Sequence, residues 1–187
     1  MINLHIIIAS MRPGRVGLPV GEWFNGFAEA DDRFNVRLID LLEVNLPFMD
    51  EPNHPRLGQY THDHTRAWSE TIAAADAYVF VTPEYNHGMP PSLKNAIDYL
   101  NREWAYKPVG FVSYGGVSGG TRSAEHATGV VTTVNMMPVP IAVNVPFVAQ
   151  FINDDGEFEP NEPTEKGAAA MLNELEKWAN ALRVIRE

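Results

Sequence analysis

The sequence contains no cysteine, no long apolar run and few basic residues, and each absence excludes a class of protein. Without cysteine, the 187-residue chain can form no disulfide, thiolate nucleophile, CxxC redox pair or zinc–sulfur site. Its apolar runs are far shorter than the roughly 18 residues that a membrane span needs. No basic segment precedes an apolar one near Met1, so we predict no secretory signal and a cytoplasmic protein.

Acidic side chains dominate the charge. The chain has 24 acidic and 14 basic residues, a formal net charge of −10 at pH 7. Because such a surface repels nucleic acids and anionic membranes, we predict neither as a partner. Any bound anion must then be held locally, by a few arginines and backbone amides. Hydrophobic residues make up 45% of the chain, a globular value, and we expect one domain over residues 1–187.

Strand-like and helix-like segments alternate along the chain. Apolar, β-branched runs predict strands at residues 4–8, 35–40, 77–82, 109–113 and 140–145. Helical spacing predicts helices at residues 16–29, 62–75, 91–101, 121–136 and 164–183, with long loops at 41–60 and 153–163. This alternation favours an α/β fold: a doubly wound parallel sheet with helices on both faces. Since such sheets bind ligands beyond the carboxyl ends of their strands, three loops become the candidate site.

The first of these loops joins a strand to a helix. It reads Ser10-Met11-Arg12-Pro13-Gly14-Arg15-Val16-Gly17. Helix N-terminal amides favour an anion, and guanidinium groups suit phosphate. The loop matches neither GxxxxGK[ST] nor GxGxxG, so the common nucleotide fingerprints fail. We predict a phosphate site here; the alternative is a tight turn with two solvated arginines.

The other two loops suit a flat ligand. The second reads Pro83-Glu84-Tyr85-Asn86-His87-Gly88-Met89-Pro90, and the third reads Tyr114-Gly115-Gly116-Val117-Ser118-Gly119-Gly120. Tyr85 offers a flat amphipathic surface, and Asn86 can bond the edge of a heterocycle. The glycines of the third loop leave room for a ring close to backbone. The alternatives are a proline-stiffened connection and a flexible turn. Together the loops indicate a phosphorylated planar ligand. FMN fits, with its phosphate on the first loop and its ring on the second and third.

At these residues the chain resembles the NAD(P)H-dependent FMN reductases of flavodoxin-like fold, a group that includes chromate, quinone and azo reductases. The resemblance rests on Ser10-x-Arg12-Pro13-Gly14-Arg15, on Thr82-Pro83-Glu84-Tyr85-Asn86-x-Gly88-x-Pro90-x-x-Leu93-Lys94-Asn95-Ala96-Ile97-Asp98, and on Ser113-Tyr114-Gly115-Gly116-x-Ser118-Gly119-Gly120-x-Arg122. It implies a five-stranded flavodoxin-like sheet of order 2-1-3-4-5, with FMN as cofactor and NADPH or NADH as electron donor. It also implies a homodimer or homotetramer with the flavin near the subunit interface.

The resemblance also implies roles for individual residues. Phosphate would be held by Ser10, Arg12, Arg15, Val16 and Gly17. The isoalloxazine ring would be lined by Pro83, Glu84, Tyr85, Asn86, His87 and Gly88, and flanked by Ser113, Tyr114, Gly115, Gly116 and Gly119. Related first loops often carry Ser or Thr where this chain has Met11 and Gly17. The arginines and backbone amides are then expected to hold more of the phosphate.

The function expected is an FMN-dependent oxidoreductase without an obligatory catalytic side chain, since the flavin carries the chemistry. The small-molecule acceptor is left open among quinones, azo and nitro compounds, metal oxyanions and free flavin. A non-enzymatic, flavodoxin-type electron carrier is the first alternative. A phospho-receiver domain is the second, but it needs an aspartate where Thr82-Pro83 ends the third strand.

Two further groups of residues complete these predictions. His54, His62 and His64 lie near Asp50 and Glu51 in the sequence, but without a recognised ligand spacing, so we predict solvated surface or a lid and no metal. Trp68 and Trp104 are expected to serve in packing or at an interface. Trp104 and Tyr106 would form an exposed apolar patch that favours a homo-oligomer.

Overall fold

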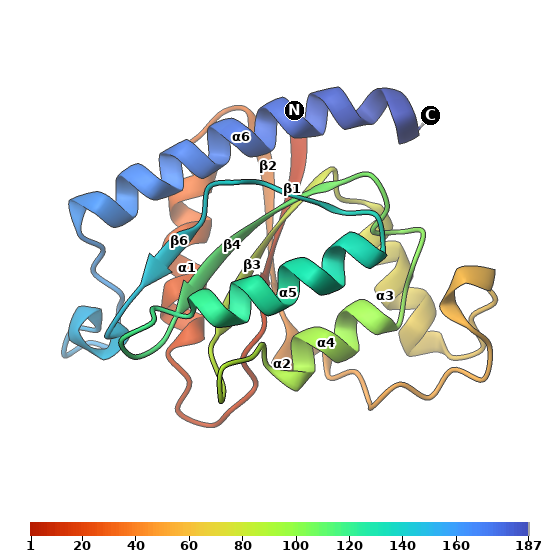
Figure 1. Ribbon diagram of the computed structural model, residues 1–187, viewed down its shortest axis with the longest axis horizontal. Coiled ribbons are helices and arrows are strands. Elements are labelled where there is room, and N and C mark those ends of the chain that lie inside the picture. Colours follow the sequence, from red (N-terminus) through yellow and green to blue (C-terminus); the bar gives the residue numbers. More distant parts are fainter. Residues whose placement is uncertain (187) are drawn as a thin grey trace.

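The computed structural model describes residues 1–186 and contains a parallel sheet covered by helices on both faces (Figure 1). The strands are β1 (Ile2–Ile8), β2 (Phe34–Asp40), β3 (Ala77–Pro83), β4 (Pro108–Tyr114), β5 (Met137–Pro138) and β6 (Val143–Val145). Their order is β2-β1-β3-β4-β5, and every neighbouring pair is parallel. The predicted fold and strand order are therefore confirmed.

The last strand differs from the prediction at residues 140–142. Instead of one strand over residues 140–145, two short strands pair with β4. The strand β5 pairs with the beginning of β4, and β6 pairs with its end. Pro138 and Pro140 have no N–H to donate to a ladder, which accounts for the break between the two pieces.

The helices form two layers. They are α1 (Gly17–Glu29), α2 (Leu41–Val44), α3 (Asp63–Ala73), α4 (Pro91–Asp98), α5 (Thr121–Thr133) and α6 (Glu162–Arg186), with short 3-10 helices at Pro55–Leu57 and Val148–Phe151. In Figure 1, α6 lies along one side of the sheet and α4 and α5 along the other. Within β1, Ile6 packs into the core under α1 and α6, whereas Ile7 packs into the core under α3, α4 and α5. Burial on both faces explains why β1, β3 and β4 are mostly apolar along their length, whereas the edge strand β2 carries polar residues at exposed positions.

Both tryptophans examined in the sequence are core residues. Trp68 is 2% and Trp104 0% exposed. The indole of Trp68 donates to Ala96 O at 2.9 Å, and that of Trp104 to Ile97 O at 3.1 Å, so both secure the C-terminal part of α4. The prediction of packing is confirmed, and the prediction that Trp104 forms an exposed patch is wrong. Within residues 1–186, no helix combines the length and the apolarity that crossing a membrane requires.

The connection over residues 41–60 is more ordered than a simple loop. Asp40 begins α2 by accepting a hydrogen bond from Leu42 N at 2.9 Å, and Asn45, with φ of 49°, ends it. The chain then runs past α4 before it reaches α3. This route brings residues 46–49 to the same end of the sheet as the three candidate loops.

Candidate functional site

The three predicted loops converge at the carboxyl edge of the sheet. Parallel pairing sets Ile8 beside Val81, and Pro83 beside Tyr114, so β1, β3 and β4 end close together. The loop after β1 and the loop after β3 both contribute to one cavity through Arg12 and Tyr85. All of the predicted site residues therefore lie in one region, although their side chains face different partners.

Two buried hydroxyl groups meet at the start of α1. Ser10 is 0% and Tyr114 3% exposed, and neither side-chain oxygen has a hydrogen-bond partner among the described residues. A Cβ on Gly17, the first residue of α1, would overlap both oxygens. Burial raises the pKa of Tyr114, so its hydroxyl stays protonated. Two unpaired hydroxyls beside helix N-terminal amides form a cradle suited to an anion.

The two arginines of the first loop differ in their contacts. Arg15 Nη1 donates to Ser10 O and to Asp40 Oδ1, each at 2.6 Å, and Nη2 also contacts the Asp40 carboxylate. This ion pair is largely buried and ties the first loop to the end of β2. Arg12 makes no ion pair with the residues that the structure describes. Arg12 is thus the available cation of this loop, whereas Arg15 is engaged in holding the loop.

The second loop is a tight turn. Tyr85 and Gly88 exchange two backbone hydrogen bonds of 3.0 Å, with Asn86 and His87 between them at φ of 49° and 67°. Positive φ at both central residues is the geometry of a type I′ turn. A Cβ on Gly88 would lie 3.1 Å from His126 Nδ1. Gly88 therefore allows α5 to approach this turn, a packing role that the sequence did not reveal.

Glu84 joins the second loop to the third. Its carboxylate accepts hydrogen bonds from Ser118 Oγ at 2.8 Å, Arg122 N at 3.1 Å and Arg122 Nη1 at 2.9 Å. Burial opposes ionisation of Glu84, but the bonds from Arg122 and Ser118 outweigh it and lower its pKa. The Glu84 side chain thus holds the two loops in register, and its carboxylate is already engaged before any ligand binds.

The third loop contains glycines of two kinds. Gly119 and Gly120 have φ of 59° and 81°, values that the turn itself requires. A Cβ on Gly116 would meet nothing within 4 Å, so this glycine faces open space. Ser113 Oγ lies 2.8 Å from both Gly119 O and Asn144 Oδ1, so its hydroxyl is used within the fold. Only part of the glycine run leaves room for a ligand.

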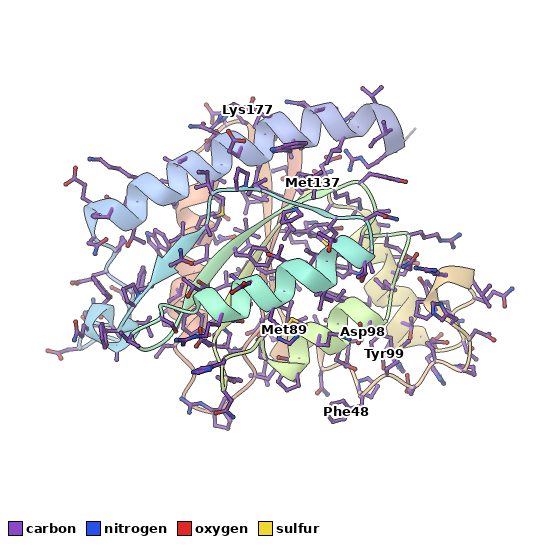
Figure 2. The ribbon with its side chains drawn as sticks, in the orientation of Figure 1. Phe48, Met89, Asp98, Tyr99, Met137 and Lys177 are labelled. Carbon is purple, nitrogen blue, oxygen red and sulfur yellow. The ribbon has the colours of Figure 1, made fainter. Side chains whose placement is uncertain are left out.

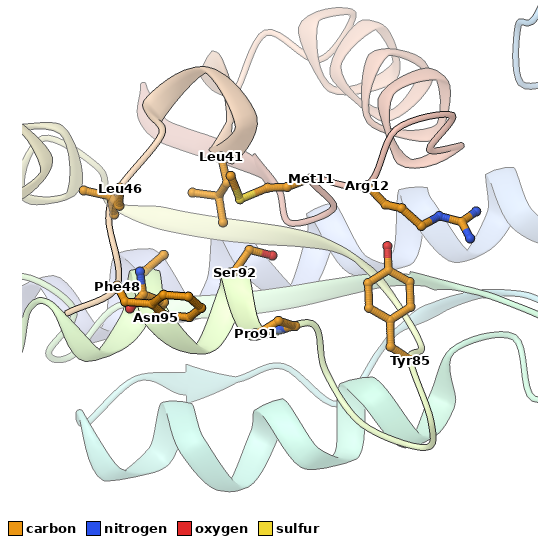
Figure 3. A pocket seen from close by; sticks show the side chains of 10 residues that line it. Met11, Arg12, Leu41, Leu46, Phe48, Tyr85, Pro91, Ser92 and Asn95 are labelled. Atoms are coloured by element: carbon orange, nitrogen blue, oxygen red, sulfur yellow. The ribbon is translucent and has the colours of Figure 1, made fainter.

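A cavity of about 320 Å³ opens beside these loops (Figure 3). It is lined by Met11 and Arg12 of the first loop, Tyr85 of the second, Leu41, Leu46 and Phe48 of the 41–60 connection, and Pro91, Ser92, Asn95 and Ala96 of α4. The contribution of the connection and of α4 to this cavity was not predicted. The length of the 41–60 connection could have indicated this role, since long loops in compact domains often take part in binding.

His62 and His64, at the start of α3, lie beside Asp50 and Glu51. The rings of His62 and His64 stack with centroids 5.1 Å apart, and His64 Nε2 lies 3.0 Å from Asp50 Oδ1. Glu51 accepts hydrogen bonds from the backbone amides of Thr61 and His62. Over residues 1–186, no group of three or more His, Asp or Glu side chains is placed to hold a metal ion.

Comparison with known proteins decides the family. The model of the NADPH-dependent FMN reductase family matches residues 2–150, which include all three loops. The chain belongs to this family. An NAD(P)H-dependent FMN reductase from Schizosaccharomyces pombe is 38% identical over 148 residues, covering 77% of this chain and 74% of the relative. A 2-hydroxy-1,4-benzoquinone reductase from a Burkholderia species is 29% identical over 174 residues, covering 82% of this chain and 92% of the relative.

Solved structures of FMN reductases and related flavoenzymes share the fold. FerB from Paracoccus denitrificans, described as a flavoenzyme NAD(P)H:(acceptor) oxidoreductase, superposes with a TM-score of 0.75 at 21% identity, covering 97% of this chain and 98% of FerB. The family resemblance seen in the sequence is confirmed. Family membership also confirms the predicted class of enzyme, an oxidoreductase that uses FMN and takes electrons from NAD(P)H.

Proposed function

We propose that the first loop of this FMN reductase holds the phosphate of FMN, with Ser10, Tyr114 and Arg12 as its side-chain ligands. The observation that carries the proposal is the pair of buried, unpartnered hydroxyls at Ser10 and Tyr114, next to the first turn of α1. A phosphate would accept hydrogen bonds from both, which removes the cost of burying them unpaired. Arg12 adds the nearby positive charge that an acidic protein otherwise lacks.

This assignment gives Tyr114 a different role from the one the sequence predicted. Its ring was expected to flank the isoalloxazine, but its hydroxyl points to the first loop. The tyrosine hydroxyl thereby supplies a hydroxyl where related loops carry Ser or Thr. Gly17 leaves the space that the Tyr114 hydroxyl needs. Arg15, in this proposal, positions the loop through Asp40 rather than serving as the main phosphate ligand.

The isoalloxazine ring would lie against the second and third loops. When bound, FMN supplies the redox chemistry by taking a hydride from NAD(P)H and giving electrons to an acceptor. The chain supplies position: Tyr85 lines the cavity, Gly116 faces open space, and Glu84 keeps the two loops together. No side chain of the site needs to give or take a proton for the hydride to move.

The acceptor is proposed to be a small organic molecule, with a quinone favoured. Two observations support this class: the mainly apolar lining of the cavity, and the 2-hydroxy-1,4-benzoquinone reductase among the relatives. Turnover separates an enzyme from a flavodoxin-type carrier. Anaerobic addition of NADPH or NADH to the FMN-loaded protein should bleach the visible absorbance of the oxidised flavin. Adding benzoquinone should restore it repeatedly.

The phosphate assignment has its own test. Titration of the apo-protein with FMN and with riboflavin, followed by flavin fluorescence, should show FMN bound at least roughly tenfold more tightly, because one charge-assisted hydrogen bond is worth about 1.5–3 kcal/mol. Equal affinities would contradict a phosphate site at the first loop.

We also propose a single FMN-binding domain over residues 1–187 that assembles as a homodimer or homotetramer in the cytoplasm. The oligomer is supported by exposed apolar side chains, Val117 at 76% and Tyr106 at 44%, rather than by the buried Trp104. Light scattering at micromolar concentration should give a mass of at least two chains.

A further inference from the structure

The outer side of the apolar cavity is a strip of backbone that α4 holds in place. Residues 46–49 pass over α4 without forming a helix or strand, and Leu46 and Phe48 of this strip line the cavity. Phe48 is 84% exposed and projects from the surface in Figure 2. In Figure 3, Phe48 and Asn95 lie side by side at the same end of the cavity.

Asn95 fastens this strip through both ends of its amide group. Its Nδ2 donates to Pro47 O at 2.7 Å, and its Oδ1 accepts from Met49 N at 2.9 Å. The two bonds bracket Phe48, so the position of the phenyl ring depends on them. Asn95 is itself a lining residue of the cavity.

Tyr99 and Asp50 extend the attachment. The Tyr99 hydroxyl donates to Asp50 Oδ1 at 2.9 Å, and it lies 3.1 Å from Pro47 O. Burial, together with the Asp50 carboxylate, raises the pKa of Tyr99 to about 12, so the hydroxyl remains a donor at neutral pH. Asp50 also bonds to His64 at the start of α3. The Tyr99 hydroxyl also lies 3.3 Å from Phe48 O. Residues 46–50 are thus attached to α4 and α3, and Asn95 holds the residues on both sides of Phe48.

We propose that Asn95 is a positioning residue that sets the size of acceptor the cavity admits, by holding residues 47–49 as a fixed wall with Phe48 at the mouth. The inference rests on the proposed function, since it concerns acceptor choice. The class of acceptor it favours is an uncharged, flat molecule of one or two rings. Met11, Leu41, Leu46 and Phe48 offer it apolar surface, which a hydrated metal oxyanion would not match.

The test compares acceptors of different size in matched variants of the FMN-loaded protein. Asn95→Ala removes the two hydrogen bonds that the Asn95 side chain makes to the strip and leaves those of Tyr99. Phe48→Ala removes an exposed ring, so this variant should fold normally even if Asn95→Ala proves unstable. Lys94→Ala is the control, because Lys94 is the preceding residue of α4 and its ammonium pairs with Asp98 on the surface. The acceptors are 1,4-benzoquinone and 9,10-phenanthrenequinone.

In Asn95→Ala, the ratio of kcat/KM for the one-ring quinone to kcat/KM for the three-ring quinone should fall about fivefold or more. The change should appear mainly in KM, because a loosened wall alters how well each quinone binds and no longer excludes the larger one. Phe48→Ala should shift the preference in the same direction by a smaller factor. The dissociation constant of FMN and the rate of flavin reduction should change less than about twofold in all three variants. Hydrogen exchange at the Met49 amide should accelerate in Asn95→Ala but not in Lys94→Ala.

Unchanged size preference in both Asn95→Ala and Phe48→Ala would overturn this inference while leaving the proposed function intact. Loss of FMN binding in Asn95→Ala alone would also overturn it, since Asn95 would then act on the cofactor. If the parent protein turned over no acceptor, the proposed function would fail, and the inference with it.

Discussion

The two ends of the sheet both bury polar groups, but they treat them in opposite ways. At the amino end, Lys107 is 6% exposed, and its ammonium donates to Ile72 O, Ala73 O and Tyr78 Oη at 3.0–3.2 Å. At the carboxyl end, the hydroxyls of Ser10 and Tyr114 are equally buried and have no partner in the described chain. The first set is satisfied by hydrogen bonds within the fold, whereas the second set is left without them.

The difference separates scaffold from site more reliably than burial does. Unpartnered buried atoms occur elsewhere too, at His5, Asn25 and Thr65, so a single one marks nothing. What distinguishes the carboxyl end is that two hydroxyls meet at Gly17, the first residue of a helix, where a Cβ would not fit. The same loop also carries Arg12, which makes no ion pair with the described residues. Convergence of this kind is expected where a bound anion completes the hydrogen bonding.

Gly17→Ala should have the largest effect at the carboxyl end of the sheet, on the affinity for FMN. The added methyl group overlaps both hydroxyls, so it displaces two of the proposed phosphate ligands. With about 1.5–3 kcal/mol for each hydrogen bond to the charged group, FMN affinity should fall by more than about a hundredfold. Gly26→Ala is the matched control, because Gly26 lies on the exposed side of the same helix with nothing within 4 Å of its Cβ. It should leave FMN affinity unchanged and stabilise the helix by roughly 0.5–1 kcal/mol.

Arg15→Ala tests a buried ion pair at the carboxyl end, the pair between Arg15 and Asp40, whose role is in stability. Removing Arg15 leaves the Asp40 carboxylate, 9% exposed, without its counter-ion. We expect the free energy of unfolding to fall by about 3 kcal/mol, near the lower end of what breaking a buried pair costs. Urea titrations of Arg15→Ala, Asp40→Ala and the double variant measure the coupling. Additive losses would mean that the pair contributes nothing beyond its separate contacts.

Arg12→Ala should act on binding and not on folding. With no ion pair to lose, its free energy of unfolding should stay within about 0.5 kcal/mol of the parent's. FMN affinity should fall about ten- to a hundredfold, and riboflavin affinity should barely change. If Arg15→Ala weakened FMN binding more than Arg12→Ala did, at a temperature where both variants are folded, the division between the two arginines would be wrong.

These arginines also show how far sequence reasoning reaches. The parallel sheet and the convergence of the three loops were predictable, because apolar runs and their alternation with helices depend on local sequence. The strand order was implied by the family resemblance and not by these runs. Arg15 and Arg12 look equivalent in the sequence, and only the approach of Asp40 from the end of β2 separates them. The direction of the Tyr114 hydroxyl and the docking of residues 47–49 on α4 likewise depend on tertiary packing.

The amino end can be tested through the titration of Lys107. Burial lowers the pKa of Lys107 from its usual 10.5 to about 8. Between these two values the unfolded chain holds a proton that the folded protein has released, so unfolding takes up a proton and the free energy of unfolding rises with pH. Relative to Lys107→Met, the parent should gain about 1 kcal/mol between about pH 8 and pH 9. Urea titrations at both pH values, with Lys177→Met as the exposed control, measure the difference. Identical pH slopes for the parent and Lys107→Met would mean that the ammonium is not destabilised by burial, and that the amino end is less closed to water than its three hydrogen bonds indicate.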